Sequence, residues 1–386
     1  MRKLVIAIAI ILMVILLSAQ EIQHGVITIN VEVPVRVFKG NRFLDHLTRE
    51  DFEVYENGIL QQLEAVYLIK KTDITREDTS LRPDESRKRF VPQVGRNFIL
   101  AFEITDYFPR IKEALAYFFE HVITLQDTLT VVTPVKTYRF NSAALRDMPK
   151  EKISALLNER LRSDIKKGCM EYHSMLREYK SLWDSSLSAQ ETQRLLIQKI
   201  REFRQLRNLS EEKIQAFADH LKNLGGQKFV FLFYQRELFP FPELPFEYFA
   251  NLELTSELMT LVPQNIHKIK QRFSDSSITI NFFYITQPQR ELADDYFALR
   301  QGILWEDISA GIFSTFLEMA ESTGGLAESS ANIAYALEKG SVASENYYLL
   351  YYSPKHYAAD GKFREIKVKV KELNCRVIHR AGYISD

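Results

Sequence analysis

The chain has 386 residues, of which 46% are hydrophobic and 26% are charged, with only 14 glycines and 12 prolines. This composition is typical of a folded globular protein and excludes a largely disordered chain. Fifty basic residues balance fifty acidic ones, so the overall charge argues against nucleic acid and against an anionic membrane surface as partners.

The first 19 residues have the pattern of a secretory signal peptide. Arg2 and Lys3 precede an uncharged apolar run over residues 4–17, and Ser18 and Ala19 follow it. The run has 14 residues, fewer than the roughly 20 that a membrane-spanning helix needs. We therefore expect cleavage after Ala19 and export to the periplasm or the medium. The alternative is an uncleaved N-terminal anchor, and only in that case do we expect the protein to contact a membrane.

Residues 20–69 are predicted to form an N-terminal β segment. Valines alternate with more polar residues at positions 31 to 37, as they do on a half-buried strand. Asn57 and Gly58 then separate two apolar runs, and this pair is a strong signal for a tight hairpin turn. Residues 70–95 are polar and of mixed charge, so we interpret them as a solvated linker.

Residues 96–340 alternate between strand and helix patterns. Strands are predicted over 98–102, 129–135, 137–140, 228–234 and 278–285, and helices near 109–122, 246–273 and 312–320. Such alternation favours a mostly parallel sheet with helices on both faces. Residues 141–227 have no strand pattern and form a predicted helical insertion, longer than a crossover requires. We interpret it as carrying contacts to a partner, or alternatively as a cover for one face of the sheet.

The C-terminal residues 341–386 return to β patterns over 347–352, 363–370 and 376–384. Ile366, Val368 and Val370 alternate with three lysines, which we interpret as a solvated strand face. The N-terminal segment offers too few strands to bury two faces alone. We therefore expect the C-terminal segment to pack with it as one β domain, with the α/β domain inserted between them.

Motifs for catalysis and for metal binding are scarce. The sequence has no nucleophile elbow, phosphate-binding loop, dinucleotide-binding glycine motif or zinc-protease motif, and its eight histidines are scattered. The two cysteines, Cys169 and Cys375, are far apart. We favour two separate thiols, although a disulfide is possible outside the cytoplasm. These observations favour a binding protein over an enzyme.

Four segments resemble the bacterial von Willebrand factor A-related domain proteins described from acidobacteria. They are LTREDFEVYENG over 47–58, AESTGG over 320–325, YYLLYYSP over 347–354 followed by DGKFREIKV over 360–368, and RAGY over 380–383. Their order and spacing extend over most of residues 25–386. The resemblance implies a von Willebrand factor A-like, Rossmann-like α/β fold with a parallel sheet, together with the β domain of the terminal strands.

The resemblance also implies a metal-ion-dependent adhesion site, which this sequence has in a degenerate form. The family's Asp-x-Ser-x-Ser loop matches residues 103–107, where Glu103 replaces Asp, Thr105 replaces the first Ser and Tyr107 replaces the second. Asp106 remains as an acidic residue, but Gln235 stands where a later acidic residue is expected. We therefore expect no metal and no cofactor.

The sequence thus predicts an exported protein–protein interaction module, of adhesion or scaffold type, whose partner is another protein. One alternative is a metal-dependent adhesion protein in which Glu103, Thr105 and Asp106 hold Mg²⁺ or Ca²⁺. Another is a hydrolase that uses Glu103 and Asp106 as paired carboxylates at the carboxyl ends of parallel strands.

Overall fold

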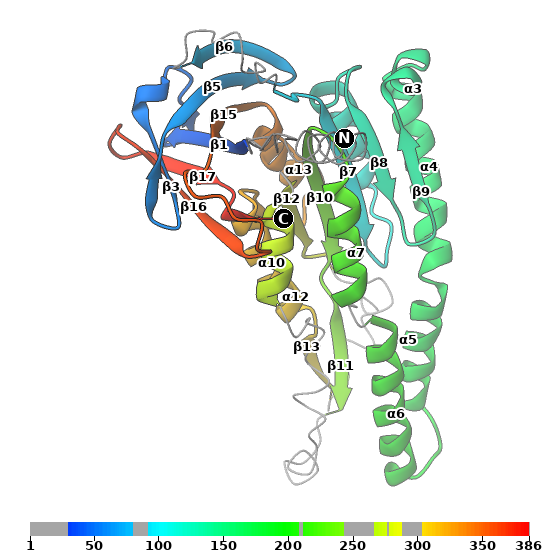
Figure 1. The fold of residues 1–386 in the computed structure, drawn as a ribbon. Helices are drawn as coiled ribbons and strands as arrows, with labels where there is room; N and C mark the ends of the chain where they lie inside the picture. The colour runs from blue at the N-terminus through cyan, green and yellow to red at the C-terminus, as the bar shows by residue number, and fades with distance from the viewer. Residues whose placement is uncertain are drawn as a thin grey trace, which may run out of the picture.

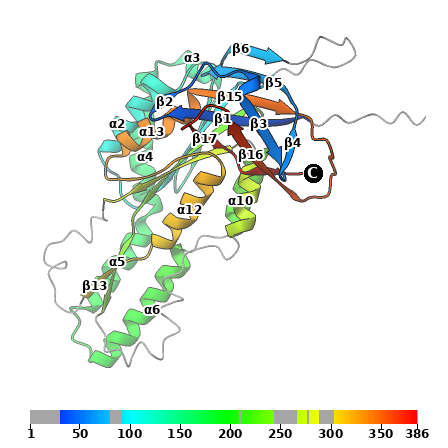
Figure 2. The same cartoon turned by 90° about the vertical axis from the view of Figure 1, so that its left-hand side faces the viewer.

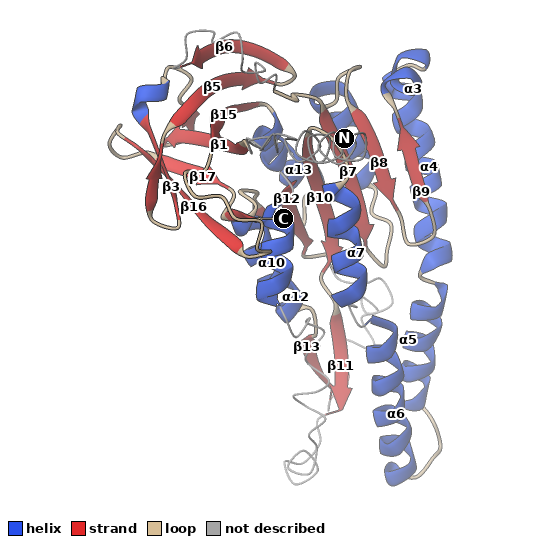
Figure 3. Cartoon of the chain, viewed as in Figure 1, coloured by secondary structure: helices blue, strands red, loops and turns tan. Residues whose placement is uncertain are grey.

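The computed structural model describes residues 30–79, 92–207, 211–242, 266–275, 278–287 and 303–385. The predicted signal peptide and residues 246–265 of the predicted helix over 246–273 lie outside the described residues. The described residues form four sheets with helices around them (Figures 1 and 3). None of the helices within these ranges is long and apolar enough to cross a membrane.

The largest antiparallel sheet, called sheet A here, combines strands from both ends of the chain. Its order is β17-β1-β15-β5-β6, with the short strand β2 also paired to β1. The N-terminal part of the chain supplies β1 (Val31–Lys39), β2 (Arg42–Phe43), β5 (Leu63–Lys70) and β6 (Asp73–Thr79), and the C-terminal part supplies β15 (Asn346–Tyr352) and β17 (Arg376–His379). The terminal segments are therefore hydrogen-bonded to each other, with β15 between β1 and β5.

A second antiparallel sheet, sheet B, packs against one face of sheet A. Its order is β18-β16-β3-β4, formed by β3 (Phe52–Glu56), β4 (Ile59–Gln61), β16 (Phe363–Val370) and β18 (Gly382–Ile384). Asn57 and Gly58, between β3 and β4, have φ values of 48° and 81°. Two positive φ angles in a two-residue connection are what a type I′ hairpin requires, and this pair of residues tolerates them.

Strand β15 is buried from Tyr347 to Tyr352 because both faces of sheet A are covered there. Tyr348, Leu350 and Tyr352 belong to the core shared with sheet B, whereas Tyr347, Leu349 and Tyr351 belong to a separate buried cluster on the opposite face. That opposite face meets the α/β part of the chain. A continuous apolar run, without alternation, is the pattern of a strand buried on both sides.

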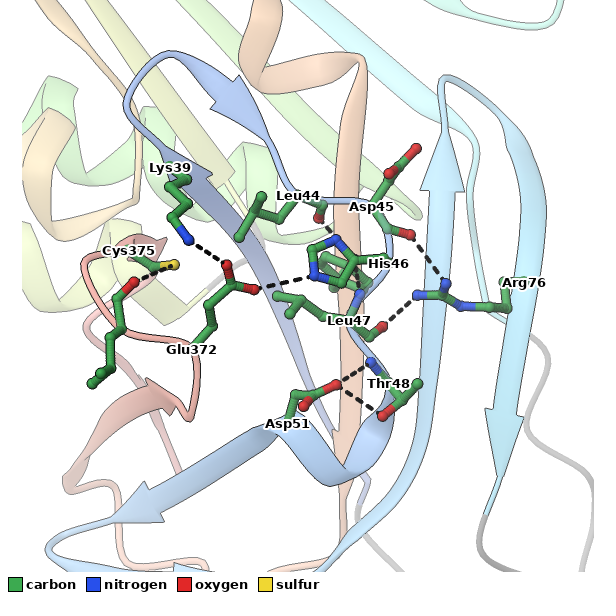
Figure 4. Close-up of polar contacts among 12 residues, drawn as sticks. Lys39, Leu44, Asp45, His46, Leu47, Thr48, Asp51, Arg76, Glu372 and Cys375 are labelled. Atoms are coloured by element: carbon green, nitrogen blue, oxygen red, sulfur yellow. Dashed lines mark hydrogen bonds and ion pairs between the residues drawn. The ribbon is translucent and has the colours of Figure 1, made fainter.

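The polar range 70–95 includes a strand, contrary to the prediction of a linker. β6 lies at the edge of sheet A and is mostly exposed, so its sequence has no hydrophobic alternation by which it could be recognised. Arg76 of β6 donates to the backbone carbonyls of Asp45 and Leu47, in the loop between β2 and β3, and so holds the edge strand to this loop (Figure 4). In the same loop the Thr48 N–H donates to Asp51 and holds the pKa of that carboxyl below its usual value.

The α/β part contains the third sheet, sheet C, in the order β14-β12-β10-β7-β8-β9. Its strands are β7 (Arg96–Glu103), β8 (Thr128–Val132), β9 (Thr137–Phe140), β10 (Gln227–Gln235), β12 (Ile278–Ile285) and β14 (Ala327–Ser330). Five of these strands are parallel to one another, and β9 pairs antiparallel with β8. All nine residues of β10 are buried, so both faces of the sheet are covered at its centre.

The predicted fold class, a von Willebrand factor A-like parallel sheet of Rossmann type, is wrong. Sheet C is mixed because the connection from β8 to β9 spans only residues 133–136, too short for the crossover that parallel strands require. The other sheets are antiparallel, including the ribbon of β11 (Leu238–Pro242) and β13 (Ile303–Asp307). Antiparallel pairings therefore outnumber parallel ones, and the protein is a mixed α/β protein.

Residues 141–227 contain helices and, among their described residues, no strand before β10 begins at Gln227. The helices are α3 (Ser142–Asp147), α4 (Lys150–Gly168), α5 (Met170–Leu182), α6 (Ala189–Arg207) and α7 (Glu211–Lys222). Figure 2 shows that α5 and α6 extend side by side away from sheets A, B and C, and Tyr179 and Phe203 of these helices pack against Phe239 of β11. They form an arm that is joined to the body through α4.

The remaining helices pack around sheet C. They are α2 (Arg110–Tyr117), continued by the π-helical turn η2 (Phe118–Val122), α10 (Ile266–Asp275), α12 (Ala310–Ser322) and α13 (Ile333–Ser341). Two short 3₁₀ turns, η1 (Arg49–Asp51) and η4 (Val342–Ser344), precede β3 and β15. Helix α2 packs against α4 and α13, while α10 packs against α7 and α12.

Buried polar contacts join the β part to the α/β part. Arg96 at the start of β7 forms a bidentate ion pair with Asp127, at 2.9 and 2.6 Å, and also donates to the Ser344 carbonyl that precedes β15. Both charged side chains are fully buried. Glu32 of β1 accepts hydrogen bonds from Gln227 of β10 and from Tyr351, and burial raises the pKa of the Glu32 carboxyl. Such pairs are costly to break, because each leaves a buried charge without a partner.

Candidate functional site

The candidate site is a cleft of about 1130 Å³ between the loop that follows β7 and helices α4 and α5. It lies at the carboxyl end of a central strand of sheet C, where open α/β sheets usually bind ligands. Nine of its fourteen lining residues come from α4 and α5. The lining residues are Thr105, Asp106, Tyr107, Pro109, Lys112, Asn158, Arg162, Ile165, Lys166, Met170, Glu171, His173, Ser174 and Arg177.

The floor of the cleft is a loop held in place by one side-chain amide. Gln235, at the end of β10, is fully buried. Its Oε1 atom accepts hydrogen bonds from the Thr105 N–H at 2.9 Å, the Thr105 hydroxyl at 2.7 Å and the Asp106 N–H at 3.0 Å. Its Nε2 atom donates to the Gln287 carbonyl and, at 3.4 Å, to Asp106. A single neutral amide thus satisfies three donors of the loop and connects two parallel strands.

Helix α5 fixes the same loop from the other side. The Nε2 atom of His173 lies 2.9 Å from the Thr105 carbonyl oxygen, which can only accept, so this nitrogen carries the proton. The same atom is 4.0 Å from a carboxylate oxygen of Asp106. The imidazole therefore serves to position the loop, and the buried Asp106 carboxylate lies between His173 and Gln235.

Tyr107 links the loop to helix α4. Its hydroxyl donates to the Asn158 Oδ1 atom at 2.5 Å, and the guanidinium of Arg162 lies 5.8 Å from the centre of its ring. Burial raises the pKa of the Tyr107 hydroxyl, so it remains a donor at neutral pH. Asn158 and Arg162 are four residues apart on α4 and therefore share one face of the helix.

The lining of the cleft has an excess of positive charge. Lys112, Arg162, Lys166 and Arg177 contribute four cations, all on exposed side chains, against the two carboxylates of Asp106 and Glu171. Within the described ranges, Lys112 and Lys166 have no ion-pair partner. A concave surface lined by one sign of charge concentrates its field and attracts ligands of the opposite sign.

The structure brings together only part of the degenerate metal site that the family resemblance implies. Thr105, Asp106 and Tyr107 line the cleft and Gln235 lies buried behind them, whereas Glu103 is exposed and does not line the cleft. These residues do not fit a divalent cation. The oxygen of Gln235 is occupied by three N–H and O–H donors, and the described ranges contain no group of three or more histidine, cysteine or acidic residues arranged to hold a metal.

Several residues of the cleft were not predicted from the sequence. Asn158, Arg162 and Lys166 repeat every four residues along α4, but a polar helix face with this spacing is most often simply solvated. His173 had no sequence signal, since its partner is a backbone carbonyl. Cys169 and Cys375 form no disulfide, and the thiol of the buried Cys169 donates to the Ile104 carbonyl.

Comparison with known proteins does not assign the chain to a family. No family model matches the sequence, and no curated protein matches it. Among solved structures, the human COPII-coat protein Sec24c is similar with a TM-score of 0.31 and 7% sequence identity; the match covers 76% of this chain and 44% of that protein's chain. So low a score carries no argument about function. The resemblance to von Willebrand factor A-related proteins stays a prediction.

Proposed function

We propose that the protein is an exported binding protein whose cleft receives an acidic segment of another protein. The observation that carries this proposal is the composition of the cleft, which has four cationic side chains and two carboxylates around a volume of about 1130 Å³. An extended peptide with several carboxylates complements both the charge and the size of such a surface.

The polar groups at the floor of the cleft support binding rather than catalysis. The Gln235 amide, the Nε2 atom of His173 and the Tyr107 hydroxyl hold the loop or join it to α4 and α5. A floor fixed in this way presents a preformed surface, which lowers the entropic cost of binding. The cations at the mouth of the cleft are exposed and able to meet a ligand.

The position of the cleft at the base of the projecting arm also favours a macromolecular partner. The cleft is lined mainly by α4 and α5, and α5 continues into the arm with α6 (Figure 2). A partner that enters the cleft therefore has a second surface beside it. Export of the protein rests on the pattern of residues 1–19, which agrees with a role outside the cytoplasm.

The proposal is tested by titrating the mature protein with a fluorescein-labelled peptide of alternating glutamate and glycine and following fluorescence anisotropy. The double substitution Arg162→Glu and Lys166→Glu reverses two cations of the cleft. The matched control is Lys152→Glu with Arg160→Glu, which makes the same charge change at exposed positions of α4 that do not line the cleft.

We expect the cleft variant to weaken binding by about tenfold or more and the control variant to change it about twofold or less. Binding to the native protein should weaken as salt is added. Equal losses in the two variants would show that the peptide senses overall charge rather than the cleft, and the proposal would be wrong.

A further inference from the structure

A second, much smaller cavity lies at the junction between sheet A and the α/β part, away from the cleft. It has a volume of about 10 Å³, which is room for one particle of roughly the size of a water molecule. Strands β1, β10, β12, β15 and β17 and the end of α12 surround it. Its lining residues are Pro34, Arg36, Gln227, Phe229, Ile278, Thr279, Thr323, Gly324, Ala343, Tyr347, His379 and Arg380.

The charge around this cavity is not balanced. Two guanidinium groups, those of Arg36 and Arg380, line it, and no carboxylate does. Arg380 donates to the backbone carbonyls of Glu32 and Ser274 and interacts electrostatically with the Glu32 carboxylate. Arg36 is therefore the cation of this lining that lacks a counter-charge. His379 is neutral and adds no further positive charge, because its Nε2 atom accepts a hydrogen bond from the Val368 N–H and burial lowers its pKa.

Arg36 is the unusual residue of the pair. The residue exposes only 9% of its surface, and within the described part of the chain its side chain has no hydrogen bond and no ion pair. Burial and the nearby Arg376 lower the pKa of the Arg36 guanidinium to about 10, so it still carries its charge at neutral pH. A buried cation without a counter-charge is strongly unfavourable.

A second unsatisfied donor lies beside Arg36. Strands β1 and β15 pair Val35 with Tyr348 and Pro34 with Leu349, and the same register places Tyr347 opposite Arg36. Directly opposite residues project from the same face of a sheet. The hydroxyl of Tyr347 is buried and has no hydrogen-bond partner within the described part of the chain. The guanidinium of Arg36 and the hydroxyl of Tyr347 therefore line the same cavity, and no aspartate or glutamate is among its lining residues.

We propose that this cavity binds a monatomic anion of the chloride class, with Arg36 supplying the compensating charge and Tyr347 an additional O–H donor. A water molecule would fit the volume but would leave the charge of Arg36 uncompensated. The small space beside Arg36 favours a monatomic ion over phosphate, sulfate or the carboxylate of a partner. The site is independent of the binding proposed for the cleft.

The bound anion would join the two parts of the protein. Arg36 belongs to sheet A, whereas Thr323 and Gly324 end helix α12, and Gly324 brings its backbone close to the guanidinium. A ligand that binds only the folded state stabilises it in proportion to the logarithm of its concentration. The thermal stability of the protein should therefore depend on chloride at constant ionic strength.

The experiment measures the melting temperature of the native protein in sodium gluconate and in sodium chloride of equal ionic strength. We expect chloride to raise Tm by about 2 °C. The variant Arg36→Met, which retains the volume and removes the charge, should lose this dependence. The control Arg42→Met removes an exposed arginine of the same sheet and should keep it.

A second measurement does not depend on the folding of a variant. Crystals of the native protein soaked in bromide should show an anomalous peak beside Arg36. A Tm that is equal in the two salts, or a chloride effect that persists in Arg36→Met, would overturn the proposal. So would a bromide-soaked crystal with a water molecule and no anomalous peak at this position.

Discussion

Replacing Gln235 by leucine should destabilise the loop at the floor of the cleft, because three donors of this loop share the Gln235 side chain as their acceptor. The substitution keeps a side chain of similar size and removes the Oε1 acceptor. The N–H groups of Thr105 and Asp106 and the hydroxyl of Thr105 then lose the partner that they contact at 2.7 to 3.0 Å. All these groups are buried.

The expected magnitude follows from these three donors. A buried donor left without a partner costs about 1–3 kcal/mol, so three set a range of about 3–9 kcal/mol. Thr105 and Asp106 also line the cleft, and water entering from it can satisfy part of the loop. We therefore expect Gln235→Leu to lower the free energy of unfolding by about 3 kcal/mol. Thr105→Val removes a single hydroxyl bond and should cost about 1 kcal/mol.

Urea unfolding followed by circular dichroism measures both values on the mature protein. The control is Gln198→Leu, the same substitution at an exposed position of α6, where the amide contacts only Glu202; it should change stability by less than about 0.5 kcal/mol. If Gln235→Leu costs no more than Thr105→Val, the amide does not hold the loop and the description of the cleft floor is wrong.

Three further predictions concern the junction and the core. Arg96→Met leaves the fully buried Asp127 carboxylate without its cation and should lower the free energy of unfolding by about 3–5 kcal/mol in urea; a loss below about 1 kcal/mol would contradict this. Gly325→Ala places a methyl group 1.7 Å from the Ile280 backbone oxygen, so we expect a loss of about 3 kcal/mol or more, and a native Tm would refute it. Burial lowers the pKa of His379 below its model-compound value of 6.5, so the unfolded chain binds more protons there, and stability should fall as pH falls below about 6.5. Urea titrations at about pH 7.5 and about pH 5.5 should show this loss in the native protein and a smaller one in His379→Gln.

The strands with continuous or alternating apolar residues could be predicted from the sequence. β12 has the predicted bounds, Ile278–Ile285, and β10 extends the predicted strand by one residue at each end. Strands without such patterns were missed. β6 is a polar edge strand, β14 has the sequence AESS, and β11 contains two prolines, which weaken any strand pattern.

The pairing and relative direction of the strands were harder to predict than the strands themselves. A periodic pattern indicates that a segment is extended but not which neighbour it pairs with, and the pairing of β1 with β15 joins residues about 300 positions apart. The fold class was therefore wrong although most of its strands were found. The length of a connection constrains the relative direction of two neighbouring strands. The turn between β8 and β9 is too short for a parallel crossover, so these strands pair antiparallel.

The candidate site was predicted in part. Thr105, Asp106 and Tyr107 were selected because they match the adhesion-site loop that the family resemblance implies, and they line the cleft. Glu103 was selected for the same reason and is exposed outside it. Successive side chains of a strand point to opposite faces of the sheet. A shift of one residue along the strand therefore decides which side chain enters a site. Whether the cationic side chains of α4 line the cleft depends on how this helix packs against the loop, and a local sequence pattern does not predict that packing.

The most direct test of binding at the cleft is photo-crosslinking from its rim in the cells that make the protein. Met170 lines the cleft and is 61% exposed, and Leu373, in the turn between β16 and β17, is 79% exposed and lies in the β part. With p-benzoylphenylalanine at position 170 we expect one defined protein adduct, which is lost when Arg162→Glu and Lys166→Glu are added. The same adduct from position 373, or no adduct from position 170, would contradict the account.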